Sequence, residues 1–142
     1  MENRNGLIVA AMAIQADGRA ERNAGLLMAR GLGRKRRRAT MGADKAYDSR
    51  DFVRTLRELN ITPHVRQRRV GTALDGRTTR QPGYPISLHK RWRVEKPFGW
   101  LESIPSLRQV KLRGLENVGW LFVFGCAAYN LLRIPRLRAR YA

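Results

Sequence analysis

Residues 39–65, ATMGADKAYDSRDFVRTLRELNITPHV, decide the fold because they predict a strand, a helix and a second strand in succession. The first strand covers residues 39–43, and the second covers residues 61–65. Between them, Asp48 or Ser49 can cap a helix, because a short polar side chain accepts hydrogen bonds from unpaired backbone N–H groups. The apolar positions of that helix follow a helical period: Phe52, Val53, Leu56 and Leu59. This order of elements predicts a parallel sheet and an α/β fold.

The segment before residue 39 adds a turn, an apolar run and a helix. The tight-turn dipeptide Asn5-Gly6 is followed by apolar residues 7–14, which predict the second strand of a hairpin. The partner strand would precede Asn5, so we expect further structure N-terminal to the turn. Asp17 can cap a helix that starts near residue 19.

The second half of the chain predicts a basic loop followed by helices. Residues 66–85 are rich in Arg, Gln, Gly, Thr and Pro, which is typical of a loop. We expect two helices within residues 87–132, the first ending near residue 104 and the second starting near residue 115. The second helix contains the longest apolar run, residues 118–129. Because this run is shorter than the roughly 18 residues that cross a bilayer, it predicts a buried helix.

The composition indicates a polyanion as the partner. The 142 residues carry 29 Lys+Arg against 11 Asp+Glu, a formal net charge of +18, and 43% of them are hydrophobic. This length suits one domain with a real core, and the charge favours phosphate, since each cation that meets a phosphate releases counterions. We expect no membrane partner. The single Cys126 excludes an intrachain disulfide, and the N-terminus shows no signal-peptide pattern, so we expect an intracellular protein.

Two carboxylates are candidates for chemistry. Asp44 closes the first strand of the sheet, and ligands bind at the carboxyl ends of strands in open α/β sheets. Its side chain suits Mg²⁺ coordination, or it is only a turn residue. Glu95 follows Arg91 by four residues, and a plain surface ion pair between them is the alternative to a functional role. Pro97 either kinks this helix beside Glu95 or marks a helix that starts there.

Several strings of the sequence point to one family. They are ADKAYDS at residues 43–49, RWRVEKPFGWL at residues 91–101 and AAYNLL at residues 127–132. With the loop DGRTTR at residues 75–80 and the opening MENRNG at residues 1–6, they resemble the C-terminal part of bacterial insertion-sequence transposases of the DDE type. The resemblance covers essentially the whole chain. It implies an α/β fold, namely a partial ribonuclease H-like fold that lacks its first strands and is followed by C-terminal helices.

The resemblance also implies a chemistry and a set of site residues. In the family, two Asp and one Glu hold two Mg²⁺ or Mn²⁺ ions during cleavage and transfer of DNA strands. By position, Asp44 matches the second Asp and Glu95 matches the Glu, so both are candidate catalytic residues and metal ligands. Arg91 matches the Arg that precedes this Glu. The run RKRRR at residues 34–38 is either a solvated loop or a phosphate contact. The candidate DNA-binding residues are Arg36, Arg37, Arg38, Arg68, Arg69, Lys90, Arg91 and Arg93.

Two departures from the family pattern bear on activity. The first Asp of the family lies on a strand upstream of the point where this chain starts, and Glu102 stands where the signature has a Lys. We therefore expect weak metal binding, negligible cleavage by the chain alone and marginal stability. The expected partners are DNA and either another transposase chain or a missing N-terminal half, in the bacterial cytoplasm at the nucleoid. Inhibition of a full-length transposase and plain nucleic-acid binding by a small basic protein are the alternative functions.

Overall fold

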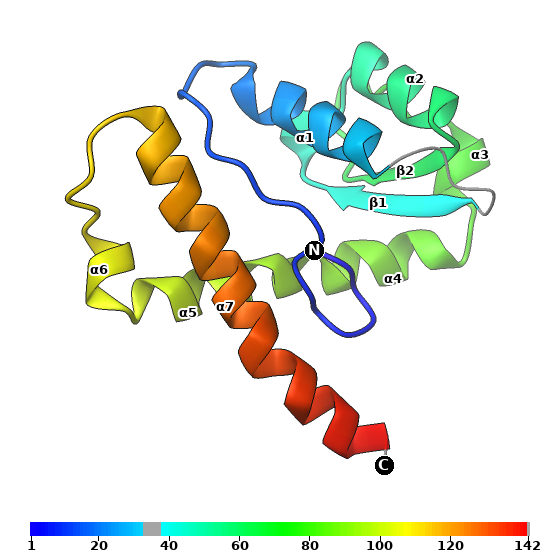
Figure 1. Cartoon of the computed structure of the whole chain (residues 1–142). Coiled ribbons are helices and arrows are strands. Elements are labelled where there is room, and N and C mark those ends of the chain that lie inside the picture. The colour runs from blue at the N-terminus through cyan, green and yellow to red at the C-terminus, as the bar shows by residue number, and fades with distance from the viewer. Residues whose placement is uncertain (33–37, 142) are drawn as a thin grey trace. The chain divides into compact units, whose positions relative to one another are not determined.

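The computed structural model describes residues 1–32 and 38–141 and separates into two compact units. Residues Asp17–Arg91 form the first, here named the sheet unit. Residues Met1–Ala16 and Trp92–Ala142 form the second, here named the helical unit. The strands lie in the sheet unit, and the longest helix lies in the helical unit (Figure 1).

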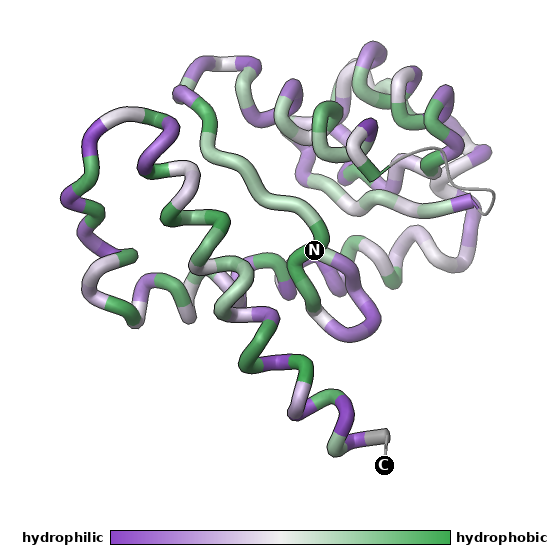
Figure 2. Tube along the Cα trace, viewed as in Figure 1, coloured by the Kyte–Doolittle hydropathy of each residue, from purple (hydrophilic) through white to green (hydrophobic). Residues whose placement is uncertain are grey.

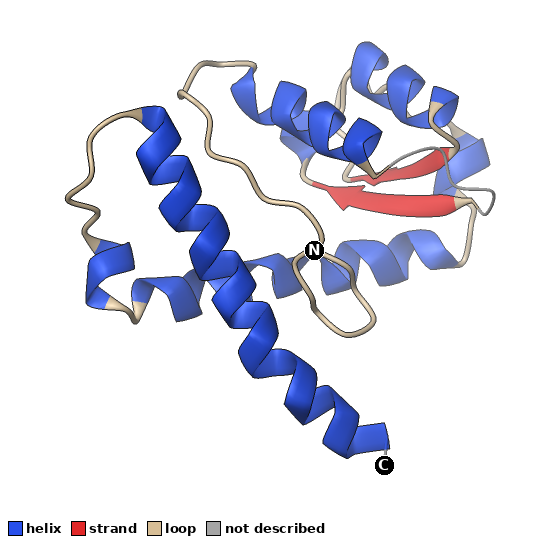
Figure 3. Ribbon diagram, viewed as in Figure 1, coloured by secondary structure: helices blue, strands red, loops and turns tan. Residues whose placement is uncertain are grey.

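The sheet unit has three layers (Figure 1 and Figure 3). Two parallel strands, β1 (Ala39–Ala43) and β2 (Ile61–Val65), form the middle layer. The helices α1 (Ala20–Gly31) and α2 (Arg50–Glu58) cover one face, and α4 (Gly83–Lys90) covers the other. The predicted succession of strand, helix and strand and the parallel sheet are confirmed.

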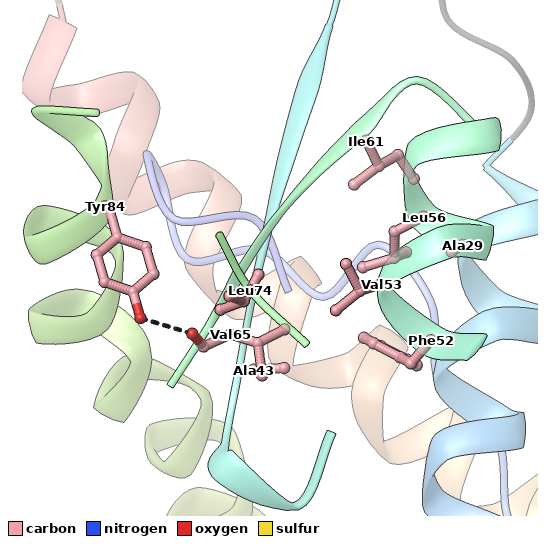
Figure 4. Packing of buried hydrophobic residues seen from close by; sticks show 9 residues of the cluster. All are labelled: Ala29, Ala43, Phe52, Val53, Leu56, Ile61, Val65, Leu74 and Tyr84. Carbon is pink, nitrogen blue, oxygen red and sulfur yellow. Dashed lines mark hydrogen bonds between the residues drawn. The ribbon is translucent and has the colours of Figure 1, made fainter. Parts of the chain in front are cut away.

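The core of the sheet unit forms where the apolar side of α2 meets the strands. The parallel register pairs Ala39 with Ile61 at one end of the sheet. The Ser49 hydroxyl caps α2 by accepting a 3.4 Å hydrogen bond from the N–H of Phe52, which confirms Ser49 as the cap. Apolar side chains at intervals of three and four residues face the sheet together. The buried residues, drawn in Figure 4, are Ala29, Ala43, Phe52, Val53, Leu56, Ile61, Val65, Leu74 and Tyr84.

The range predicted as the basic loop 66–85 is partly helical, which corrects that prediction. The short helix α3 (Gly76–Thr79) begins where the Asp75 carboxylate accepts a 3.1 Å hydrogen bond from the N–H of Arg77. Helix α4 begins at Gly83, within the same range. Only residues 66–75 of the predicted range contain neither helix nor strand. Below, the name basic loop refers to residues 66–75 alone.

In the helical unit, residues 7–14 form no strand, so the predicted hairpin strand is wrong. The tight turn is present: the N–H of Glu2 donates to the carbonyl of Leu7 at 2.9 Å, and Gly6 adopts a φ of 70°. The hydrophobic segment that follows (Figure 2) meets the Asn130 amide, which pairs with the N–H and carbonyl of Ile8 at 2.9 and 2.8 Å. A strand requires a neighbouring backbone along its length, and one amide satisfies a single residue.

The helix predicted from residue 87 to residue 104 is divided. After α4, a 3-10 helix η2 (Arg91–Val94) leads into α5 (Glu95–Glu102). Pro97 lies in the first turn of α5, where a missing N–H removes no intrahelical hydrogen bond. Of the two alternatives for Pro97, the observed one is therefore the helix that starts at Glu95.

The chain ends with α6 (Pro105–Arg108) and the long helix α7 (Leu115–Tyr141), which continues through Pro135. Only one side of α7 packs within the helical unit, and many of its apolar side chains are exposed. The predicted buried helix is therefore wrong, because the apolar residues of this run lie on two sides of the helix. Among the described residues, α7 is long and apolar enough to cross a membrane, by length and composition only.

Candidate functional site: the carboxyl end of β1

Asp44 lies directly after β1, at the end of the strand where the sequence places it. Its Oδ1 accepts a 2.6 Å hydrogen bond from the backbone N–H of Lys45 and so caps the 3-10 helix η1 (Lys45–Tyr47). The side chain is about half exposed, at 48%. One carboxylate oxygen is thus used by the turn, and the other is left for a second partner.

That second partner is Arg91. Its Nη1 lies 3.0 Å from the Asp44 Oδ2, and 32% of the arginine side chain is exposed. This pairing takes the place of the Arg91–Glu95 surface pair that helical spacing offered. The Lys45 N–H, followed by the Arg91 guanidinium, holds the pKa of Asp44 below its usual 3.8. The carboxylate is therefore ionised and ion-paired at neutral pH.

The packing of α4 on the sheet brings Arg91 to this position. The Tyr84 hydroxyl donates a 2.8 Å hydrogen bond to the carbonyl of Val65 (Figure 4), and the His64 Nδ1 lies 2.7 Å from the Ser87 Oγ. Both contacts join α4 to β2, and His64 is almost fully buried. These contacts therefore hold Arg91, the residue that follows α4, near the carboxyl end of β1, the strand beside β2. The residues in these two contacts are 19 and 23 positions apart in the sequence. Local sequence patterns cannot predict contacts over such separations.

A buried carboxylate, Asp48, shapes the basic loop beside this site. Asp48 is 1% exposed, and its two oxygens accept 2.8 Å hydrogen bonds from the backbone N–H groups of Arg68 and Ala73. These bonds hold Arg68 near η1, where its Nε donates to the carbonyl of Lys45 at 3.4 Å. Sequence spacing indicated only a capping role for Asp48, because its true partners lie 20 and 25 residues away.

The other predicted DNA-binding residues of the sheet unit differ in exposure, and Arg38 precedes β1, at the opposite end of that strand from Asp44. Arg38 and Arg69 are exposed, and Lys90 is half-buried at the end of α4. The predicted residues Arg36 and Arg37 lie outside the described residues. Within the described part of the sheet unit, the predicted DNA-binding residues with a side-chain contact to the Asp44 turn are therefore Arg91 and Arg68.

The remaining predicted site residues belong to the helical unit. Glu95 is the first residue of α5 and is exposed, a position where the helix dipole favours an anion. Glu102 ends the same helix and is also exposed. Arg93 is half-buried, and its Nη1 donates a 2.6 Å hydrogen bond to the carbonyl of Asn3. Arg93 therefore has a structural partner within its own unit.

The described residues do not assemble a divalent-metal site. Across residues 1–32 and 38–141, no group of three His, Cys, Asp or Glu side chains could hold an ion. Both oxygens of Asp44 have partners, and the Arg91 guanidinium already supplies a positive charge beside them. A divalent ion such as Mg²⁺ requires oxygen donors that are free to coordinate. The donor set at Asp44 therefore does not fit Mg²⁺ or Mn²⁺ as it stands.

Comparison with known proteins identifies the family. Residues 1–131 match the family described as transposase DDE domain. No curated protein and no solved structure matches the chain. A DDE transposase domain implies a ribonuclease H-like fold, DNA binding and a function in transposition, and the family generally uses divalent metal ions. Parallel strands flanked by helices agree with that fold. The chain belongs to the DDE transposase family.

Proposed function

We propose that the chain is the C-terminal part of an insertion-sequence transposase and that it binds DNA but does not cleave it unaided. The observation that carries this proposal is the ion pair between Asp44 and Arg91 at the carboxyl end of β1. The carboxylate that the family resemblance makes a candidate metal ligand has a guanidinium as its partner. Family membership supports DNA as the ligand, and the net charge of +18 supports a polyanion.

The surroundings of Asp44 favour a phosphate. Lys45 is exposed beside it, the basic loop holds Arg68 against the same turn, and Arg91 contacts the carboxylate directly. One carboxylate among three cations leaves a local positive charge. A guanidinium has several donors in a planar fork, so Arg91 can bind a phosphate oxygen with those that Asp44 does not use.

Cleavage would require a third metal-binding carboxylate in addition to Asp44 and Glu95. The family resemblance assigns two of the three metal-binding carboxylates to this chain, Asp44 and Glu95. We infer that another polypeptide supplies the third, either a second transposase chain or an N-terminal half. The shape of the sheet supports this inference, because two parallel strands with nothing added are a marginal sheet.

Among the described residues, no strand pairs with the second edge of β1, and this edge offers a place for such an addition. The N–H of Ala39 donates to Asn60 and the carbonyl of Ala43 accepts from Arg66, so alternate residues of β1 face β2. The intervening residues Thr40 and Gly42 face the other edge and are exposed. A strand from another polypeptide could pair with their backbone groups.

DNA binding can be tested by fluorescence anisotropy with a labelled duplex of arbitrary sequence, titrated at several salt concentrations. We expect affinity to fall steeply with salt, with a slope of log K against log salt of about −0.9 for each phosphate contact. Replacing both Arg68 and Arg69 by Ala should make the slope shallower by about 1 to 2. The matched control is Arg54→Ala, since Arg54 is already paired with Asp51 at 2.9 Å on the surface of α2.

Two results would contradict the proposal. One is an affinity that does not change between low and high salt. The other is a double variant at Arg68 and Arg69 whose slope equals that of the wild type, because the basic loop would then make no phosphate contact.

A further inference from the structure

Helix α7 has two apolar sides, of which the helical unit covers one. On the covered side, Phe122 stacks with Phe98 at 6.0 Å between ring centroids, and Tyr129 meets Trp100 edge to face at 5.7 Å. The Asn130 amide on the same side pairs with the loop that follows the N-terminal turn. These contacts fix α7 within its unit and define which side points inward.

The opposite side of α7 is apolar and exposed. Steps of three, four and seven residues return to the same side of a helix, so one stripe runs along most of its length. Leu131 is 70% exposed and Trp120 is 65% exposed, although both are large apolar side chains. The exposed stripe consists of Trp120, Val123, Phe124, Ala127, Leu131 and Ile134.

Four of the residues of the exposed stripe are arranged symmetrically about its smallest residue, Ala127. Trp120 and Ile134 lie seven residues on either side of it, and Val123 and Leu131 lie four residues on either side. At these two steps a large side chain has a large counterpart, and the centre is occupied by a methyl group. Phe124 has no such counterpart, because the residue three positions after Ala127 is Asn130, which lies on the covered side. In an antiparallel pair of such helices, Trp120 would face Ile134 of the second copy, and the Ala127 residues of the two copies would meet.

The charges that flank the stripe are complementary in the same arrangement. Glu116 and Arg138 lie eleven residues on either side of Ala127, and both are exposed. Neither makes an ion pair within the described chain. Antiparallel pairing places Glu116 opposite Arg138 of the second copy at both ends, whereas parallel pairing places like charges together.

We propose that the exposed stripe of α7 is a self-association surface, on which a second copy of this chain packs antiparallel about a two-fold axis at Ala127. Such an interface is isologous: the same patch serves both copies. The small central residue allows the helices to approach closely where they cross. The proposal does not depend on DNA binding or on the identity of the catalytic residues.

The mass of the full chain in solution tests the pairing. Sedimentation equilibrium over a wide concentration range should show a species of twice the 16.3 kDa chain mass. Trp120→Ala should weaken self-association at least about tenfold, because buried aromatic anchors dominate interfaces. At a concentration where both proteins are monomeric, its circular dichroism spectrum and unfolding midpoint should stay near those of the wild type, since the side chain is mostly exposed in the single chain.

Charge reversal tests the orientation. At low salt, Glu116→Arg and Arg138→Glu should each weaken self-association, by about tenfold. The double variant should restore it, because the opposite charges face each other again. The matched control is Arg136→Glu. Arg136 is exposed on another side of α7, so this substitution should leave the association unchanged.

Three outcomes would overturn the proposal. The chain could remain at 16.3 kDa at every concentration. Its association could be unchanged by Trp120→Ala, Glu116→Arg and Arg138→Glu. Finally, Trp120→Ala could abolish binding to phosphatidylcholine vesicles while leaving the mass in solution unchanged, which would assign the stripe to a lipid surface instead.

Discussion

Replacing Asp48 by Asn is expected to destabilise the sheet unit strongly, although it changes only one atom. The buried carboxylate accepts one hydrogen bond at each oxygen, from Arg68 and from Ala73, both at 2.8 Å. An asparagine can accept only one of these bonds, and it directs its own NH₂ group at the other backbone N–H. That donor then lies in a buried place without an acceptor.

The size of the effect follows from these two bonds. Losing a hydrogen bond to a charged acceptor costs about 1.5–3 kcal/mol, and leaving a buried donor unsatisfied costs about 1–3 kcal/mol. Because these penalties overlap for a single N–H, we expect the free energy of unfolding to fall by about 2–4 kcal/mol. A domain has only about 5–15 kcal/mol in total, so the change should be easily measured.

Urea denaturation followed by circular dichroism measures this change. The matched control is Asp51→Asn, since the Asp51 side chain is 83% exposed and forms only a surface pair with Arg54. We expect the control to stay within about 0.5 kcal/mol of the wild type. If Asp48→Asn unfolded at the same urea concentration as Asp51→Asn, the anchoring role of Asp48 would be refuted.

Four further predictions follow from the same contacts. Arg91→Ala should raise the pKa of Asp44 toward 3.8, measured by NMR titration of the carboxyl group, and should reduce the stability lost as the pH falls below that value. Asp44→Asn should tighten DNA binding in anisotropy titrations, because it removes the anion that competes with phosphate for Arg91. Burial lowers the pKa of His64 below 6.5, so the unfolded chain binds its proton more readily and stability should fall as the pH drops below 6.5; His64→Gln should remove this dependence in urea titrations. The pKa of Asp75 should be about 2 by NMR, set first by its hydrogen bond with Arg77, and Arg77→Ala should raise it.

Local patterns predicted the sheet unit well because its central segment is determined locally. The strand after residue 39, the cap at Ser49 and the buried face of α2 depend on residues within a few positions of one another. The same applies to the placement of Asp44 at the end of a strand. Spacing alone could also indicate a parallel sheet, since a single helix joins the two strands.

The errors occurred where contacts between distant segments decide the structure. Residues 7–14 have the composition of a strand, yet their observed partner is the Asn130 amide, more than a hundred residues away. The partner of Arg91 is Asp44 rather than the nearby Glu95, because the packing of α4 and not helical spacing positions it. For α7, hydrophobicity indicated burial, but the helical unit covers only one of its two apolar sides.

The most direct test of the central claim is reconstitution of DNA nicking. The chain would be mixed with an N-terminal transposase polypeptide that carries the first Asp, co-purification of the two would be established, and nicking of supercoiled plasmid would be followed with Mg²⁺. We expect nicking only with both polypeptides present, and none when the chain carries Glu95→Gln, which should still co-purify and bind DNA. Nicking that survives Glu95→Gln, or nicking by the chain alone, would contradict the account.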